Sequence, residues 1–465
     1  MATSYALLSL LLLGLLCTWL ITNWLKLSKA PSPVLAGTTD LWPAYQQRNG
    51  QLRTKLIELH ARYGPIVRYG VRSISISDPE VINVVYGSRA GFITADSYKV
   101  LVGISNGKEV PNLVSTADEA RHGALRRSVA NAFTPTASLD YEKWIDATIA
   151  ELLDVIGRKK KTTPFDLANT ILFYKMDAAG RFSFGEPIGC LAAEVDVGGS
   201  IQLIRDRFTH WGRWSSLPGL ERLLYRNPRA PSGMAAAAAG KLRARAAAQE
   251  KKDGGGSEHA DLLQLPRGQQ GEPADAGHDG RDAGDTTAAS VTSALYFLLK
   301  NSDAMYKLEQ ELAGAKLPEI PSFAAESMRV FSSATWPMER LVPDGGVTIA
   351  GMFFPAGTSV GCFPSAIHRN TKLYGEDAGV FRPERWLTPD REALRLMEAA
   401  HMGFSRGRRS CLGQNIAVMQ MKKVIPALVV KFQMSLVDPD APLDADFAPA
   451  VACSNSLYVR SEAKE

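Results

Sequence analysis

The sequence predicts a mainly α-helical fold with small β-sheets, an α+β class, preceded by one transmembrane helix. Three observations support this: an uncharged apolar run at the N-terminus, several stretches with apolar residues at helical spacing, and two short regions of strand-like alternation. The chain has 465 residues, of which 45% are hydrophobic and 22% charged. This usage excludes a chain that is disordered, collagen-like or coiled-coil as a whole, while the length alone would allow about three domains.

Charge and cysteine content exclude two further classes of protein. Lys and Arg number 53 against 48 Asp and Glu, and a net charge of +5 is too small to predict nucleic-acid binding. The five cysteines are far apart, without a CxxC pair or a Cys/His cluster, so we expect neither a disulfide framework nor a structural zinc site. We expect Cys190, Cys362 and Cys453 to be buried as small hydrophobic residues.

The first element is an apolar run long enough to cross a bilayer. Residues 5–25 contain no charged side chain and would span about 30 Å of hydrocarbon as a helix. No basic residue precedes the run, whereas Lys26 and Lys29 follow it, which favours an uncleaved anchor over a signal peptide. The positive-inside rule then places the rest of the chain in the cytosol. We expect an anchor over residues 1–30 and one large domain over residues 31–465.

Helices and short strands follow the anchor. Residues 52–64 have helical spacing and end at Gly64, and residues 66–78 alternate like a hairpin with its turn at Gly70. A second strand-like region spans residues 339–362. Further helices are predicted over residues 117–134, 140–157, 165–182 and 198–212.

One long segment does not fit a packed domain. Residues 226–295 contain no Phe, Trp or Tyr, and small or polar residues dominate. We expect residues 227–283 to be a solvated helix at about 233–250 followed by a flexible loop, or the product of an aberrant splice, because nothing there can form a core.

The segment at 404–413, FSRGRRSCLG, is the most informative part of the sequence. Cys411 lies there in a Gly/Arg turn directly before a helical run. The helix dipole and the neighbouring arginines stabilise a thiolate, as a metal ligand or nucleophile requires, and Gly407 and Gly413 allow close backbone approach to a flat group. The alternative is a buried cysteine in a basic surface loop.

This segment resembles the haem-binding loop of cytochrome P450 enzymes, FxxGxRxCxG. Glu326-Ser-Met-Arg329 resembles the ExxR helix motif of that family. Residues 381–386, FRPERW, resemble its meander motif, and residues 283–287, AGDTT, resemble its oxygen-activation motif. The four segments occur in the family's order. Three further stretches, IELHARYGPIVRYG, SISDPEVINVVYG and HGALRRSVANAF, are similar to the sequences of fungal microsomal enzymes of the pisatin-demethylase-like group.

The resemblance covers about residues 1–225 and 284–460, and it implies a haem cofactor. Cys411 would be the axial thiolate ligand of the iron. Glu326, Arg329 and Arg385 would form a buried structural triad that shapes the haem-side core. By itself, Glu326 with Arg329 would be an exposed helix pair.

The haem carboxylates need buried cations or donors. The resemblance assigns this role to Arg409, to His122 and Arg126 of one helix, and to the strand residue Arg340. Arg127 competes with Arg126, and either could instead be a surface charge.

Asp285 and Thr286 match the acid–alcohol pair that relays protons during oxygen activation in this family. The match departs from the family pattern, because Asp282 stands where a small residue is usual and the preceding PADAGHDGRD lacks the apolar half of the helix. Either the helix starts at the motif or this region is aberrant, and Asp285 could be only the N-cap of a helix over 286–300.

The resemblance implies a single-pass, ER-bound haem-thiolate monooxygenase with a cytosolic catalytic domain. It would use O₂ and two electrons from NADPH-cytochrome P450 reductase to oxidise a hydrophobic small molecule in fungal secondary metabolism. The alternatives are a haem-binding or haem-less relic without turnover and a tethered binding protein without cofactor. The substrate and the oxidised carbon do not follow from the sequence.

Two surface features complete the predictions. The residues Arg406, Arg408, Lys422 and Lys423 flank the cysteine loop and form a candidate basic dock for the reductase. The aromatic residues Phe208, Trp211 and Trp214 fall where the family has a substrate lid, although core packing or membrane contact explains them equally well.

Overall fold

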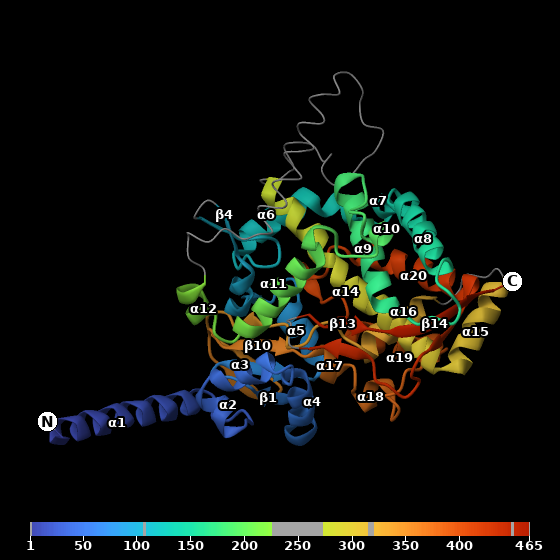
Figure 1. The fold of residues 1–465 in the computed structure, drawn as a ribbon. Helices are drawn as coiled ribbons and strands as arrows, with labels where there is room; N and C mark the ends of the chain where they lie inside the picture. The colour runs from blue at the N-terminus through green and yellow to red at the C-terminus, as the bar shows by residue number, and fades with distance from the viewer. Residues whose placement is uncertain (1, 106–107, 226–272, 315–319, 448–450, 465) are drawn as a thin grey trace.

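Helices surround one central helix, α14 (Pro273–Lys300), and small sheets lie beside them in the computed structural model (Figure 1). The structure describes residues 2–105, 108–225, 273–314, 320–447 and 451–464. The mainly helical prediction with small sheets is confirmed. The helices that precede α14 are α1 Ala2–Lys26, α2 Val34–Thr38, α3 Leu41–Arg48, α4 Leu52–Tyr63, α5 Ile82–Tyr86, α6 Glu119–Ala130, α7 Pro135–Leu139, α8 Glu142–Gly157, α9 Leu167–Phe184, α10 Cys190–Ala193, α11 Ser200–Trp214 and α12 Pro218–Leu224.

Six described helices follow α14, and the last two of them, α19 and α20, precede and follow the cysteine loop. They are α15 Ser302–Ala313, α16 Ile320–Val330, α17 Pro364–Ile367, α18 Thr371–Tyr374, α19 Arg391–Ala400 and α20 Gln414–Lys431. Short 3₁₀ turns connect the helices at η1 Pro79–Val81, η2 Asp96–Leu101, η3 Asn131–Phe133, η4 Val197–Gly199, η5 Pro383–Leu387 and η6 Gly407–Arg409.

The helix limits follow from local signals. The side chain of Asp118 caps α6 by accepting from the backbone N–H of Ala120 and Arg121, and Asp166 caps α9 in the same way. Helix α9 ends at Gly185, whose φ of 78° is the left-handed conformation that glycine adopts without strain. The four helices predicted between residues 117 and 212 are confirmed, with ends that differ by a few residues.

The largest sheet has the strand order β1-β2-β10-β7-β3. The predicted hairpin pairs Ile66 with Ile76, and β10 adds to it in parallel. Strand β7 pairs antiparallel with β10, whereas β8 and β9 form a hairpin of their own. The strands are β1 Ile66–Arg68, β2 Ser73–Ile76, β3 Ile93–Thr94, β4 Gly103–Ser105, β5 Lys108–Val110, β6 Phe165–Asp166, β7 Arg340–Leu341, β8 Val347–Ile349, β9 Met352–Phe354, β10 Ser359–Cys362, β11 Phe432–Leu436, β12 Asp444–Asp446, β13 Cys453–Ser456 and β14 Tyr458–Ala463.

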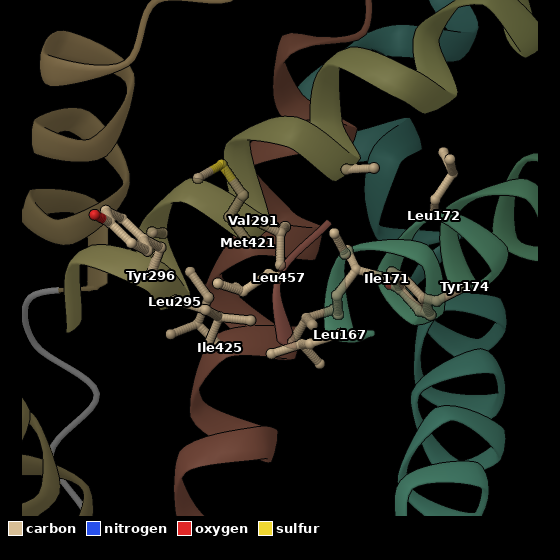
Figure 2. Close-up of a cluster of buried hydrophobic side chains, with 14 of the residues drawn as sticks. Leu167, Ile171, Leu172, Tyr174, Val291, Leu295, Tyr296, Met421, Ile425 and Leu457 are labelled. Carbon is tan, nitrogen blue, oxygen red and sulfur yellow. The ribbon is translucent and has the colours of Figure 1, made fainter. Parts of the chain in front are cut away.

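The main core lies where α9, α14 and α20 meet (Figure 2). Apolar side chains from the three helices point toward one another there, and Leu457 approaches them from the segment before β14. Burying a Leu or Ile side chain contributes about 1.5–3 kcal/mol, so this cluster fixes the second half of α14 against its neighbours. The labelled members are Leu167, Ile171, Leu172, Tyr174, Val291, Leu295, Tyr296, Met421, Ile425 and Leu457.

Helix α14 begins earlier than expected. Its backbone is helical from Pro273, so the expectation of a loop up to residue 283 is wrong for residues 273–283, and Asp285 is not an N-cap. The predicted helix at about 233–250 lies in residues 226–272, outside the described residues.

Helix α1 is the one described helix that is long and apolar enough to cross a membrane, over Tyr5–Lys26. Its C-terminal end is tied to the globular part by Arg68 of β1, whose side chain is fully buried. The Arg68 guanidinium donates to the carbonyl oxygens of Asn23 at 2.7 Å, Trp24 at 2.8 Å and Gly37 at 2.7 Å. One buried cation therefore satisfies the carbonyls at the end of the candidate anchor.

Arg68→Met should lower the free energy of unfolding by about 3–5 kcal/mol, because it leaves several buried carbonyls without a donor. Limited proteolysis should then cut between α1 and β1. Thermal unfolding of the detergent-solubilised protein measures the loss, and Arg72→Met, which removes an exposed guanidinium nearby, is the control. Equal stability of the two variants would contradict this role.

Lys175 of α9 is buried in the main core, where its ammonium donates to the side-chain oxygen of Gln420. Burial lowers the pKa of Lys175 to about 7. Since the unfolded chain keeps this proton up to a pH of about 10, the unfolded state binds more protons between those values, and stability should rise with pH across this window.

Replacing both partners, Lys175→Met with Gln420→Leu, should remove that pH dependence and stabilise the fold at neutral pH by on the order of 1–3 kcal/mol. Urea unfolding at a pH of about 7 and of about 9 measures both effects. Lys372→Met removes an exposed lysine and should change neither the stability at neutral pH nor its dependence on pH.

Candidate active site

The cysteine loop runs from Phe404 to Gly413 and is held by its backbone. The Cys411 N–H donates to the Phe404 carbonyl at 2.8 Å. Gly407 has a φ of 72°, and a Cβ at this position would lie 1.8 Å from the carbonyl oxygen of Tyr86. Only glycine fits there, so the close approach predicted for Gly407 is made to α5.

The Cys411 thiol lies at the start of α20 and is exposed. Desolvation by the surrounding protein raises the pKa of this thiol, whereas the backbone N–H of Gly413 and the charge of Arg126 lower it. An exposed sulfur beside a helix N-terminus and a cation suits a ligand for a metal that carries positive charge.

Helix α6 brings two predicted residues to the cysteine loop. His122 and Arg126 are four residues apart and lie on one face of this helix. Arg126 Nη1 donates to the carbonyl oxygen of Ser410 at 2.9 Å. His122 is buried, and burial together with the charge of Arg409 lowers its pKa to about 4, so the ring is neutral at pH 7.

Arg409 and Arg340 lie near His122 together with Arg126. The positive charges of all three arginines lower the pKa of His122. Arg409 Nε and Nη2 donate to Glu119 Oε1 at 3.0 and 2.7 Å. Arg340 Nη1 donates to the carbonyl of Glu339 at 2.8 Å, and its guanidinium lies over the rings of Tyr86 and Tyr98. We refer to Arg126, Arg340 and Arg409 as the cation cluster, with the neutral His122 among them.

The expected triad is assembled and fully buried. Arg329 Nε and Nη2 donate to the two oxygens of Glu326 at 2.7 and 2.8 Å, and Arg385 Nε donates to Glu326 Oε1 at 2.9 Å. Glu326 also accepts from Trp386 Nε1 at 2.9 Å and from the Arg382 N–H at 2.8 Å. Arg329 Nη1 and Nη2 donate to backbone carbonyls, which ties α16 to the meander that contains η5.

Asp285 and Thr286 lie next to each other within α14, and Asp285 is buried. Asp285 Oδ2 is 3.0 Å from the Sγ of Cys453 on β13. Burial raises the pKa of Asp285, while the Cys453 contact and the charge of Arg205 from α11 lower it. The pair lies directly before the apolar half of α14 that the main core fixes.

Comparison with known proteins decides the family. The profile described as Cytochrome P450 matches residues 39–211 and 282–459, which is more than half of the chain. The chain belongs to the cytochrome P450 family. The unmatched stretch between the two ranges, residues 212–281, contains most of the compositionally unusual segment.

The curated relatives are fungal. The cytochrome P450 monooxygenase mpaDE' of Penicillium brevicompactum is 28% identical over 90% of this chain, which spans about half (54%) of that longer protein. A cytochrome P450 monooxygenase of Aspergillus terreus is 28% identical over 90% of this chain and 92% of its own length. Pisatin demethylase of Fusarium vanettenii is 28% identical over 88% of this chain and 84% of its own.

Cytochrome P450 enzymes are haem-thiolate proteins, and the residues present fit that cofactor. Arg409 Nη1 is buried and, within the described part of the chain, has no hydrogen-bond partner. The cation cluster faces Glu119 as its acidic partner, which leaves positive charge for the two carboxylates of a haem. When bound, haem supplies an iron that activates O₂.

The sequence analysis did not predict the site contacts of several residues of this cytochrome P450. Glu119 forms an ion pair with Arg409, and Trp386 donates a hydrogen bond to Glu326. Each of these two residues therefore contacts a residue that the motifs had singled out. The position of Trp386 inside FRPERW was a usable signal for a triad partner. No local signal pointed to Cys453, which is 168 residues from Asp285 in the chain.

Other predicted residues have structural partners. The expected burial of Cys190, Cys362 and Cys453 is confirmed. Phe208 and Trp211 are buried in the main core, and Trp211 Nε1 donates to the Ser97 carbonyl at 3.0 Å. Core packing therefore accounts for these two members of the predicted lid.

Proposed function

We propose that this cytochrome P450 is a monooxygenase that inserts one atom of O₂ into a hydrophobic small molecule in fungal secondary metabolism. The observation that supports this most is that α6, β7 and the cysteine loop, three separate parts of the chain, bring the cation cluster to the loop of Cys411. The fungal monooxygenases among its relatives favour the same activity.

The roles of the chain's own residues follow from their positions. Cys411 would hold the haem iron through its thiolate, and His122, Arg126, Arg340 and Arg409 would hold the haem carboxylates. Asp285 and Thr286 would hold and transfer the protons that oxygen activation requires. The triad of Glu326, Arg329 and Arg385 would keep α16 and the meander in place beside the cysteine loop.

A reduced, carbon-monoxide-bound absorption spectrum followed by turnover with NADPH, purified P450 reductase and a panel of apolar aromatic compounds tests the proposal. Pisatin belongs in the panel because a relative is named for its demethylation. A thiolate-type Soret band with NADPH-dependent product is expected. A normal band without product from any compound would favour the relic, an alternative that the unbroken α14 disfavours.

We propose ER membrane attachment through α1, with residues 31–465 forming one cytosolic domain. Apolar residues are exposed on α2 and α12, on the side of the molecule from which α1 extends (Figure 1). A membrane that takes up α1 would cover them, because exposed apolar clusters of this kind favour an interface. The exposed residues are Val34, Leu35, Leu220, Leu223 and Leu224.

The proposed reductase dock is smaller than the four predicted residues. Lys423 is bound by Glu142 at 2.6 Å and by Asp146 at 2.5 Å, and Arg406 donates to the Glu398 carbonyl. Arg408 and Lys422 are exposed. These two residues therefore provide the charge that an acidic reductase face would meet.

Charge reversal, Arg408→Glu with Lys422→Glu, should raise the reductase concentration for half-maximal turnover by about fivefold or more at low salt, and the difference should shrink as salt is added. Lys108→Glu reverses an exposed charge on β5 as the control. A titration of NADPH consumption against reductase measures the effect. Unchanged titration curves at low salt would exclude this dock.

A further inference from the structure

A buried thiol contacts the acidic member of the α14 pair. Cys453 Sγ is 3.0 Å from Asp285 Oδ2, and the two residues are 2% and 3% exposed. The same sulfur is 3.5 Å from the Val451 carbonyl oxygen. A thiol has one proton to donate, and a charged carboxylate at the shorter distance is the stronger acceptor.

Two further charged groups act on this contact. Arg205 of α11 acts on Asp285 and on Cys453, and its Nη2 donates to the Ser454 carbonyl at 3.2 Å. The charge of Asp446 on β12 also acts on Cys453. Three elements, α11, α14 and β13, therefore meet at one buried carboxylate.

We propose that Cys453 is a positioning residue for Asp285: its S–H donates to the carboxylate and, with Arg205, keeps that carboxylate ionised and in one orientation. The role in catalysis rests on the proposed function, because a proton-relay acid beside Thr286 must present the same oxygen at each turnover. The contact itself exists whether or not the enzyme turns over.

Because Asp285 is buried, its carboxylate needs hydrogen-bond donors such as this thiol to stay ionised. A carboxylate removed from water loses solvation, which favours its protonated form, and each hydrogen bond to the charged form opposes this. Without the thiol, Arg205 would be the remaining favourable neighbour named above. The Asp285 carboxyl group should then take up a proton at a higher pH and turn more freely.

Infrared spectroscopy of the full chain measures this contact without substrate or reductase. The S–H stretch lies in a region free of other protein bands, and its loss in Cys453→Ala assigns it to Cys453. In Asp285→Asn the band should move to higher frequency, since a neutral amide is a weaker acceptor than a carboxylate. An identical band in wild type and Asp285→Asn would overturn the proposal.

A pH titration of the carboxyl band of protonated Asp285, assigned by its loss in Asp285→Asn, measures the consequence. In Cys453→Ala the midpoint should rise by about one pH unit, a tenfold change in proton affinity. Cys453→Ser supplies a hydroxyl donor and should restore the wild-type midpoint, while Cys190→Ala, which removes another buried thiol, should leave it unchanged.

The same midpoint in wild type and Cys453→Ala, over the pH range in which both stay folded, would overturn the proposal. A rise that serine does not restore would do so as well, because it would mark a packing effect. Neither result depends on turnover, so the proposed monooxygenase activity and this contact can fail separately.

Discussion

Replacing Cys411 by alanine is expected to abolish the thiolate-type band of the reduced, carbon-monoxide-bound protein and to lower NADPH-dependent turnover to the background of reductase alone. Cys411 is the exposed thiol of the cysteine loop, and the loop backbone that holds it does not need its side chain. Haem binding would then depend on the cation cluster and on apolar contacts. Absorption spectra, haem content and product formation measure the three effects.

Cys190→Ala is the matched control, because it removes a buried thiol outside the loop, while the backbone N–H of residue 190 can still donate to Asp177. The control should keep the band and the turnover of the wild type. Retention of a thiolate-type band in Cys411→Ala would mean that another residue binds the iron, and the assignment of Cys411 would be wrong.

Glu326→Gln should lower the free energy of unfolding by about 3–5 kcal/mol, because it leaves two buried arginines without their shared carboxylate. Haem content should fall together with stability, since α16 and the meander are joined through this one carboxylate. Denaturant unfolding and haem content measured on the same preparations check both.

The meander offers a matched control in Glu384, which pairs with Lys307 at 2.6 Å at the surface. Glu384→Gln should cost less than about 1 kcal/mol, because water screens exposed ion pairs. If Glu326→Gln unfolded at the same denaturant concentration as Glu384→Gln, the triad would not be the structural element that its burial indicates.

The helices and their caps could be predicted because the signals are local. Asp118 and Asp166 lie directly before the helices that they cap, and Gly64 and Gly185 end theirs. The start of α14 was predicted wrongly because PADAGHDGRD lacks the apolar face expected of a central helix. Its backbone continues from the half that is packed on α9 and α20, which shows that packing at one end outweighed composition at the other.

The sequence by itself determined the family motifs, the cysteine loop and the pairing of Glu326 with Arg329, since residues three apart on a helix share a face. Only the tertiary structure decided that Glu119 binds Arg409, that Arg68 holds the end of α1 and that Cys453 reaches Asp285. These partners are 290, 45 and 168 residues apart, and no periodicity extends that far. Their contacts depend on how the helices and sheets pack, which a local pattern does not encode.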